Sequence, residues 1–133
     1  MVIAVDFDGT IVEHNYPQIG KERPFAVDTL IQLARDGHKL ILWTAREGEL
    51  LDDAVKFCRE RGLTFYAVNS TTPDGALFQQ RGSTKIVADL YIDDRNLGGL
   101  PEWGAIYEMI TEERAKRREK ASKKRKKRWF WLF

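Results

Sequence analysis

The sequence predicts an α/β fold with a central parallel sheet covered by helices, three layers in all. Three observations predict it. Short apolar runs typical of buried strands recur along the chain, helical patterns separate most of them, and several runs end in charged or hydroxyl residues. Neighbouring parallel strands need crossover connections about as long as these helical segments, whereas neighbouring antiparallel strands need only tight turns. We therefore expect right-handed crossovers and helices on both faces of the sheet.

The elements follow in order along the chain. The expected strands are Val2–Asp6, Lys39–Trp43, Phe65–Val68 and Leu90–Ile92. One helix is expected over Phe25–Asp36, where apolar residues recur at helical spacing until Gly37. A second is expected to begin near Gly48 or Glu49 and to end at Gly62. In a last helix, Ile106, Met109 and Ile110 are expected to pack on the sheet, and the helix is expected to extend over Glu112–Arg128.

Length and charge divide the chain into a domain and a tail. At 133 residues it is long enough for one domain with a core. Residues 114–128 hold 11 of the 22 basic residues and one acid, Glu119, so the remaining 11 basic and 19 acidic residues give the rest a net charge of −8. We expect a domain over residues 1–113 and a basic, aromatic tail over residues 114–133.

The tail suggests several partners. Six consecutive basic residues, 123–128, repel one another and are expected to be solvated or disordered unless an anionic partner binds them. Bulky apolar residues, 129–133, follow them directly. Basic residues attract phosphates, while aromatic rings stack on bases or settle at a membrane interface. Nucleic acid, an anionic membrane surface and self-association into a homo-oligomer remain equal alternatives, beside a tail that merely aids solubility.

Cysteine usage suggests the compartment. The single cysteine, Cys58, cannot form an internal disulfide and lies on the apolar face of a predicted helix, where core packing is expected. No signal peptide or long apolar segment is recognisable. A reducing, cytoplasmic setting is the expectation.

Two carboxylates stand where the first strand ends. Asp6 and Asp8 are two residues apart, so both point the same way as the chain leaves the sheet, and Gly9 permits a sharp turn beside them. Asp-x-Asp-Gly alone is ambiguous, because calcium loops and solvated turns have similar compositions. The other strand ends decide between these interpretations.

Polar residues also follow the second and fourth strands. Thr44-Ala45-Arg46 ends the second, and Asp93-Asp94 ends the fourth, with Lys85 a few residues before it. Ligands of open parallel sheets sit at the carboxyl ends of the strands. Each residue alone suits a bland role, as a helix cap, a solvated amine or a turn. Together they predict one site at one edge of the sheet.

This constellation resembles the haloacid dehalogenase superfamily of Rossmann-like hydrolases. Its four ordered motifs match Asp6-x-Asp8-Gly9-Thr10, Thr44, Lys85 and Asp93-Asp94 over residues 1–110. The resemblance implies a phosphatase in which Asp6 is the nucleophile, forming an aspartyl-phosphate, and Asp8 the general acid and base. It implies that Thr44 donates a hydrogen bond to the phosphoryl oxygens and that Lys85 stabilises the nucleophile. Arg81, four residues earlier, is a rival for that cationic role.

The resemblance also implies a magnesium ion. Its ligands would be the Asp6 side chain, the Asp8 backbone carbonyl and either Asp93 or Asp94, a choice that the sequence leaves open. Hard oxygen ligands suit Mg²⁺ better than Zn²⁺. Thr10 and Arg46 are expected to contact substrate, and a salt bridge from Arg46 to Glu47 or Glu49 is an equal alternative.

Two intervals in which relatives of this superfamily carry a cap domain are short here. Residues 11–24 form a loop before the first helix, and residues 69–84 separate the third strand from Lys85. We therefore expect no cap domain, and an open site. The predicted function is a magnesium-dependent phosphomonoester hydrolase, with a nucleotide or a polynucleotide end phosphate as the slightly preferred substrate. The alternative is a non-catalytic binding protein of the same fold that attaches to an anionic polymer or membrane surface through its tail.

Overall fold

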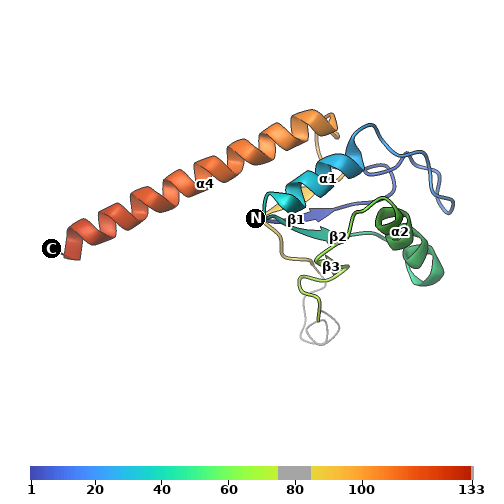
Figure 1. The fold of residues 1–133 in the computed structure, drawn as a ribbon, viewed down its shortest axis with the longest axis horizontal. Coiled ribbons are helices and arrows are strands. Elements are labelled where there is room, and N and C mark those ends of the chain that lie inside the picture. Colours follow the sequence, from blue (N-terminus) through green and yellow to red (C-terminus); the bar gives the residue numbers. More distant parts are fainter. Residues whose placement is uncertain (75–84, 133) are drawn as a thin grey trace.

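A computed structural model describes residues 1–74 and 85–132. Figure 1 shows a small sheet with helices beside it and one long helix projecting away. The strands are β1 (Val2–Val5), β2 (Lys39–Leu42), β3 (Ala67–Val68) and β4 (Leu90–Ile92), and the helices are α1 (Ala26–Arg35), α2 (Gly48–Glu60) and α4 (Trp103–Leu132). The described residues hold no second domain and no cap. Arg81, the rival cation, lies outside them.

All strand pairs are parallel, in the order β3-β2-β1-β4, which confirms the predicted α/β class. β1 lies between β2 and β4, and Val5 pairs with both Leu42 and Ile92. Hydrogen bonds continue the ladder one residue further, from Asp6 N–H to the Ile92 carbonyl (2.9 Å) and from Trp43 N–H to the Val5 carbonyl (2.8 Å). Three strands therefore end side by side, as the motif argument requires.

The two faces of the sheet are covered differently. Alternate residues of the strands, such as Ile3 and Leu42, join the main core together with residues from all three helices. Ala4 and Ile41 point to the other face, where they pack with Ala67 and Ile86. Within residues 1–74 and 85–132, this second face is covered by the segment before β4 and by no helix. The expectation of helices on both faces is thus met on one face of the described structure.

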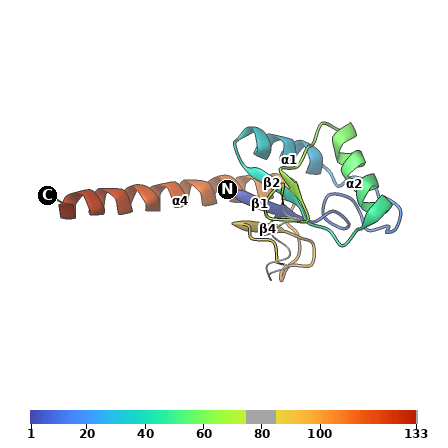
Figure 2. The ribbon, with the colours of Figure 1, turned by 90° about the horizontal axis from the view of Figure 1, so that it is seen from below.

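Helix α4 begins on the core and then leaves it. Trp103, Ile106 and Ile110 are buried, whereas Met109, which was expected to pack on the sheet, is 57% exposed. Its 30 residues imply a length of about 45 Å. Figure 2 shows the distal part extending well beyond the other elements. The predicted helical extension is confirmed, and the helix continues through Leu132.

No helix among the described residues is both long enough and apolar enough to cross a bilayer.

Candidate functional site

Thr10 holds two of the acidic residues in place. Its hydroxyl Oγ1 lies 3.0 Å from Asp6 Oδ2 and 3.3 Å from Asp94 Oδ1, and it accepts the Asp94 N–H at 3.0 Å. The Thr10 side chain is fully buried, and its carbonyl accepts the indole N–H of Trp103. These contacts tie the end of β1 to the end of β4 and to the start of α4. The residue that we expected to contact substrate therefore positions the carboxylates.

Gly9 permits the close approach of these two strand ends. Its φ of 87° lies in the region that L side chains rarely adopt. A Cβ atom at this position would also lie 2.3 Å from Asp94 Oδ2. Glycine is needed here both for the turn and for the space that Asp94 occupies.

Asp6, Asp93 and Asp94 form a cluster that could bind a metal ion. One carboxylate oxygen from each lies within 4.8 Å of the others. Burial and the negative charge of Asp93 raise the pKa of Asp6 to about 7, even though Thr10 donates a hydrogen bond to it. Carboxylates crowded so closely repel one another, and a divalent cation among them would relieve the repulsion. The donor set consists of oxygen atoms only, the ligand type that hard divalent cations such as Mg²⁺ prefer.

Asp8 faces a different partner. Arg46 grips it with two hydrogen bonds, from Nε to Oδ2 (2.7 Å) and from Nη2 to Oδ1 (2.8 Å). The side chain of Arg46 is 1% exposed and that of Asp8 is 12% exposed. The hydrogen bonds to Asp8, together with the negative charge of that carboxylate, raise the pKa of Arg46.

The remaining donors of Arg46 bind backbone carbonyls. Nη1 donates to Pro17 and to Leu50, and Nη2 donates to Gln18. All five guanidinium donors are thus used within the protein. Neither sequence alternative for Arg46, substrate contact or a bridge to Glu47 or Glu49, describes this arrangement. Instead, Arg46 fixes Asp8 to the loop after β1 and to the first turn of α2.

Thr44 lies where it was predicted, at the end of β2. Its N–H donates to Asn69 Oδ1 (2.8 Å), and its Oγ1 accepts the N–H of Arg46 (3.1 Å). Because that oxygen already accepts a bond, the hydroxyl proton can point to a ligand. Asn69, which directly follows β3 and has a φ of 50°, belongs to none of the motifs recognised in the sequence. The one feature in the sequence that could have indicated this role is an asparagine directly after a predicted strand.

These strand ends surround a cavity of about 460 Å³. The lining residues are Asp6, Asp8, His14, Tyr16, Trp43, Thr44, Ala45, Arg46, Asp93 and Arg95. Arg95, which adjoins the Asp93-Asp94 motif, supplies an exposed positive charge at the wall of this cavity. Lys85 is exposed and does not line this cavity, and its Nζ lies 5.6 Å from the ring centroid of Tyr91. Its catalytic role remains a prediction.

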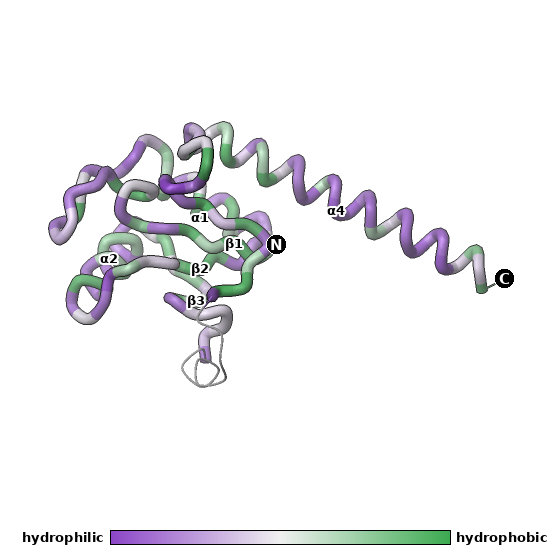
Figure 3. Tube along the Cα trace, turned by 180° about the vertical axis from the view of Figure 1, so that it is seen from behind, coloured by the Kyte–Doolittle hydropathy of each residue, from purple (hydrophilic) through white to green (hydrophobic). Residues whose placement is uncertain are grey.

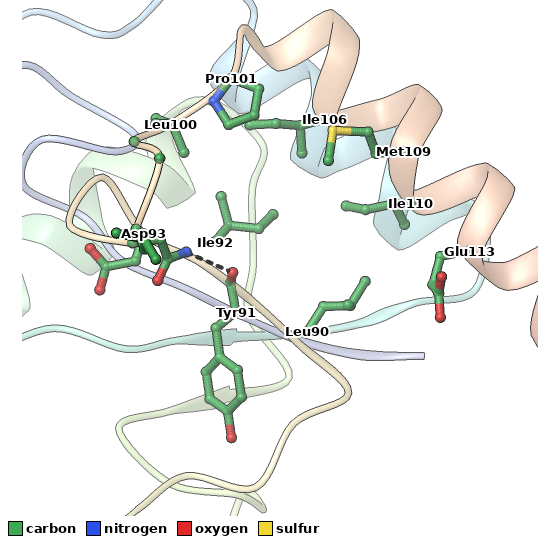
Figure 4. A pocket seen from close by; sticks show the side chains of 14 residues that line it. Leu90, Tyr91, Ile92, Asp93, Leu100, Pro101, Ile106, Met109, Ile110 and Glu113 are labelled. Atoms are coloured by element: carbon green, nitrogen blue, oxygen red, sulfur yellow. Dashed lines mark hydrogen bonds between the residues drawn. The ribbon is translucent and has the colours of Figure 1, made fainter.

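A second cavity, of about 450 Å³, lies between β4 and α4. Figure 4 shows it lined by apolar side chains such as Ile92, Leu100, Ile106 and Ile110, with the Asp93 carboxylate at one edge and pointing away from them. Asp93 is common to both cavities. An apolar surface thus adjoins the acidic cluster.

Comparison with solved structures gives a strong match. A conserved protein from Bacteroides thetaiotaomicron is 62% identical over 85% of this chain and 91% of its own, with a TM-score of 0.80. The chain belongs to the same family as this Bacteroides protein. No protein-family model matches the chain, and no curated protein is significantly similar to it. The family relationship supports the fold without naming a reaction.

Proposed function

We propose that the protein is a magnesium-dependent phosphomonoester hydrolase of the haloacid dehalogenase type. The observation that carries the proposal is the convergence of Asp6, Asp93 and Asp94 within 4.8 Å at the carboxyl edge of a parallel sheet. Thr44 and Asp8 line the same cavity. The order of Asp6, Asp8, Thr44 and Asp93-Asp94 in the chain and their meeting in space agree with three of the four motifs of that superfamily. Lys85, which matches the remaining motif, does not line the cavity.

Asp6 is the proposed nucleophile. Its carboxylate oxygen attacks phosphorus, the bond from phosphorus to the ester oxygen breaks, and an aspartyl-phosphate forms. The departing alkoxide takes a proton from the carboxyl group of Asp8, and Asp8 then removes a proton from water that attacks the phosphorus. Inorganic phosphate leaves and the Asp6 carboxylate is restored.

The electrostatics of the site explain the need for a cation. Asp6 must be ionised to attack, yet burial and Asp93 raise its pKa to about 7. Asp6, Asp93 and Asp94 would hold Mg²⁺, with the Asp8 backbone carbonyl as the further ligand that the superfamily resemblance implies. When bound, Mg²⁺ supplies positive charge that favours ionised Asp6 and offsets its repulsion from the phosphate. Thr44 orients the phosphoryl oxygens, and Arg95 adds a positive charge at the cavity wall.

A second candidate is a non-catalytic binding protein of the same fold. The specific observation that favours it is the engagement of both Asp8 oxygens by Arg46. Asp8 can exchange protons with a substrate only through its remaining lone pairs or after the pair opens. A protein that only binds metal and phosphate would need no such exchange.

The deciding experiment measures phosphate release from a panel of phosphomonoesters, including nucleotides and oligonucleotides with end phosphates, with Mg²⁺ or with chelator. The nearly isosteric Asp6→Asn variant removes the nucleophile, and Asp52→Asn on the exposed surface of α2 is the matched control. We expect Mg²⁺-dependent turnover in the wild type and in Asp52→Asn, with at least a thousandfold loss in Asp6→Asn, an order of magnitude typical of a missing nucleophile. Turnover equal in all three proteins, or absent from all, would favour the binding protein.

A further inference from the structure

The outer part of α4 carries a basic collar, residues 123–128, and an aromatic tip, residues 129–132. The four tip residues are all strongly exposed, at 67%, 77%, 77% and 79% in chain order. The collar side chains are exposed as well. Figure 3 shows hydrophilic residues over most of the projecting helix and hydrophobic ones at its distal end. Polarity therefore changes along the helix axis.

Around the axis there is no such division. Between residues 112 and 128 the only apolar side chains are Ala115 and Ala121, so no apolar stripe runs along the helix. A helix that lies flat in a membrane or along a protein groove needs that stripe. Contact through the distal end of α4 is the geometry that suits this distribution.

The collar and the tip adjoin one another. Lys124, Lys127 and Arg128 border a shallow hollow together with Trp131 and Leu132. Lys127 and Trp131 are four residues apart, as are Arg128 and Leu132, so each pair lies on one side of the helix. Positive charge is thus held within one turn of exposed apolar surface.

We propose that the distal end of α4 binds anionic phospholipid membranes, with the tip entering the interface and the collar against the headgroups. The four tip residues span about 6 Å along the axis and the six collar residues about 9 Å. Aromatic rings such as those of Trp settle at the headgroup level of a bilayer, which suits the exposed rings of the tip. Lys and Arg beside an anionic surface add attraction that salt weakens.

The charge of the rest of the chain suits this arrangement. The 118 residues outside 114–128 carry a net charge of −8, which an anionic surface repels. Residues 114–132 extend over about 27 Å, so the helix can hold the acidic domain away from the surface that its tip contacts. The candidate catalytic cavity would then stay open to solvent.

Other partners fit the distribution less well. Proteins that bind single-stranded nucleic acid place aromatic rings along a charged groove so that successive bases stack. In this helix the aromatic rings of the tip all follow the basic collar and do not alternate with it. Association through the tip with a second copy would bury the aromatic rings and leave six adjacent positive charges without a role.

The test is co-sedimentation of the full chain with vesicles of phosphatidylcholine alone or mixed with phosphatidylserine, at low and high salt. The tip variant is Phe130→Ser/Trp131→Ser/Leu132→Ser, and the collar variant is Lys124→Gln/Lys126→Gln/Lys127→Gln. Leu97→Ser, in a fully exposed loop position of the domain, is the matched control for loss of an exposed apolar residue. Circular dichroism and thermal unfolding check that each variant keeps its fold.

We expect wild type and Leu97→Ser to bind the phosphatidylserine vesicles, and binding to weaken as salt rises. The tip variant should bind at least tenfold more weakly, and the collar variant should lose up to about fivefold for each charge removed. Equal binding by the tip variant would overturn the proposal. So would tighter binding to a single-stranded oligonucleotide than to the vesicles, or tip-dependent self-association without vesicle binding.

Discussion

The carboxyl edge of the sheet and the outer part of α4 concentrate charge in opposite ways. At the sheet edge, acidic groups are partly buried and each has specific partners, as with Arg46 on Asp8 and Thr10 on Asp6. On the outer helix, basic side chains are exposed, and Lys123 with Glu119 is an example of a pair one turn apart. Charges of the first kind depend on the fold. The fold depends little on the exposed charges of the outer helix. Removing one charge should therefore have very different effects on stability in the two regions.

The largest effect is expected for Arg46→Met. This change removes the donor that Arg46 supplies to the Asp8 carboxylate and to the carbonyls of Pro17, Gln18 and Leu50, at a position where the Arg46 side chain is buried. Loss of one partner of a buried ion pair costs about 3–5 kcal/mol, so the free energy of unfolding in urea should fall by that amount.

Arg59→Met, at an exposed position near the end of α2, is the control and should change stability by less than about 0.5 kcal/mol. The double variant Arg46→Met/Asp8→Leu should recover part of the loss, because it also removes the unpaired charge. A loss equal to that of Arg59→Met would show that the Asp8 pair is not a structural link.

Gly9→Ala should have the next largest effect. The new methyl group would lie 2.3 Å from Asp94 Oδ2, and the alanine would have to adopt the native φ of 87°. We expect the left-handed backbone to lower the free energy of unfolding by about 1–2 kcal/mol and the crowding to lower it further, by about 1–3 kcal/mol. Urea unfolding measures the sum. Gly37→Ala has a similar φ of 95° with no atom within 4 Å, so it isolates the backbone cost. Equal losses in the two variants would mean that Asp94 moves aside freely.

Some contacts at the sheet edge could be predicted from the sequence and others could not. The meeting of Asp6 with Asp93 and Asp94 follows from strand ends in a parallel sheet, which local patterns reveal. The pairing of Asp8 with Arg46 joins residues 38 positions apart, and Arg46 has nearer acids in the sequence, so only the folded loop selects the partner. The cover of the second face by Ile86, which packs with Ala4 and Ile41, likewise depends on tertiary contacts that local patterns do not reveal.

A smaller effect is expected from pH. The pKa of Asp6 is raised to about 7 in the folded state, above its usual value of about 3.9 in an unfolded chain. The folded state therefore binds more protons between these values, and its stability should fall as pH rises from about 4 to 7. Because the carboxyl is only partly buried, we expect its contribution to be about 1–2 kcal/mol.

Urea unfolding in the presence of chelator, across this pH range, measures the effect. Asp6→Asn should have a flatter profile than the wild type, and Asp52→Asn should keep the wild-type profile. Saturating Mg²⁺ should also flatten the wild-type profile, because the cation favours ionised Asp6. Parallel profiles for wild type and Asp6→Asn would show that Asp6 is not the titrating group.

The smallest effect is expected on the outer helix. Replacing Lys124, Lys126 and Lys127 by Gln removes three exposed charges from a segment in which basic residues repel one another. Glutamine is nearly as good a helix former as lysine, so stability should stay within about 0.5 kcal/mol of the wild type by thermal or urea unfolding. Phosphate release from a small ester should be unchanged, since the cavity at the sheet edge includes no residue of α4. A large loss of either quantity would mean that the collar contacts the domain, and that the two regions are not independent.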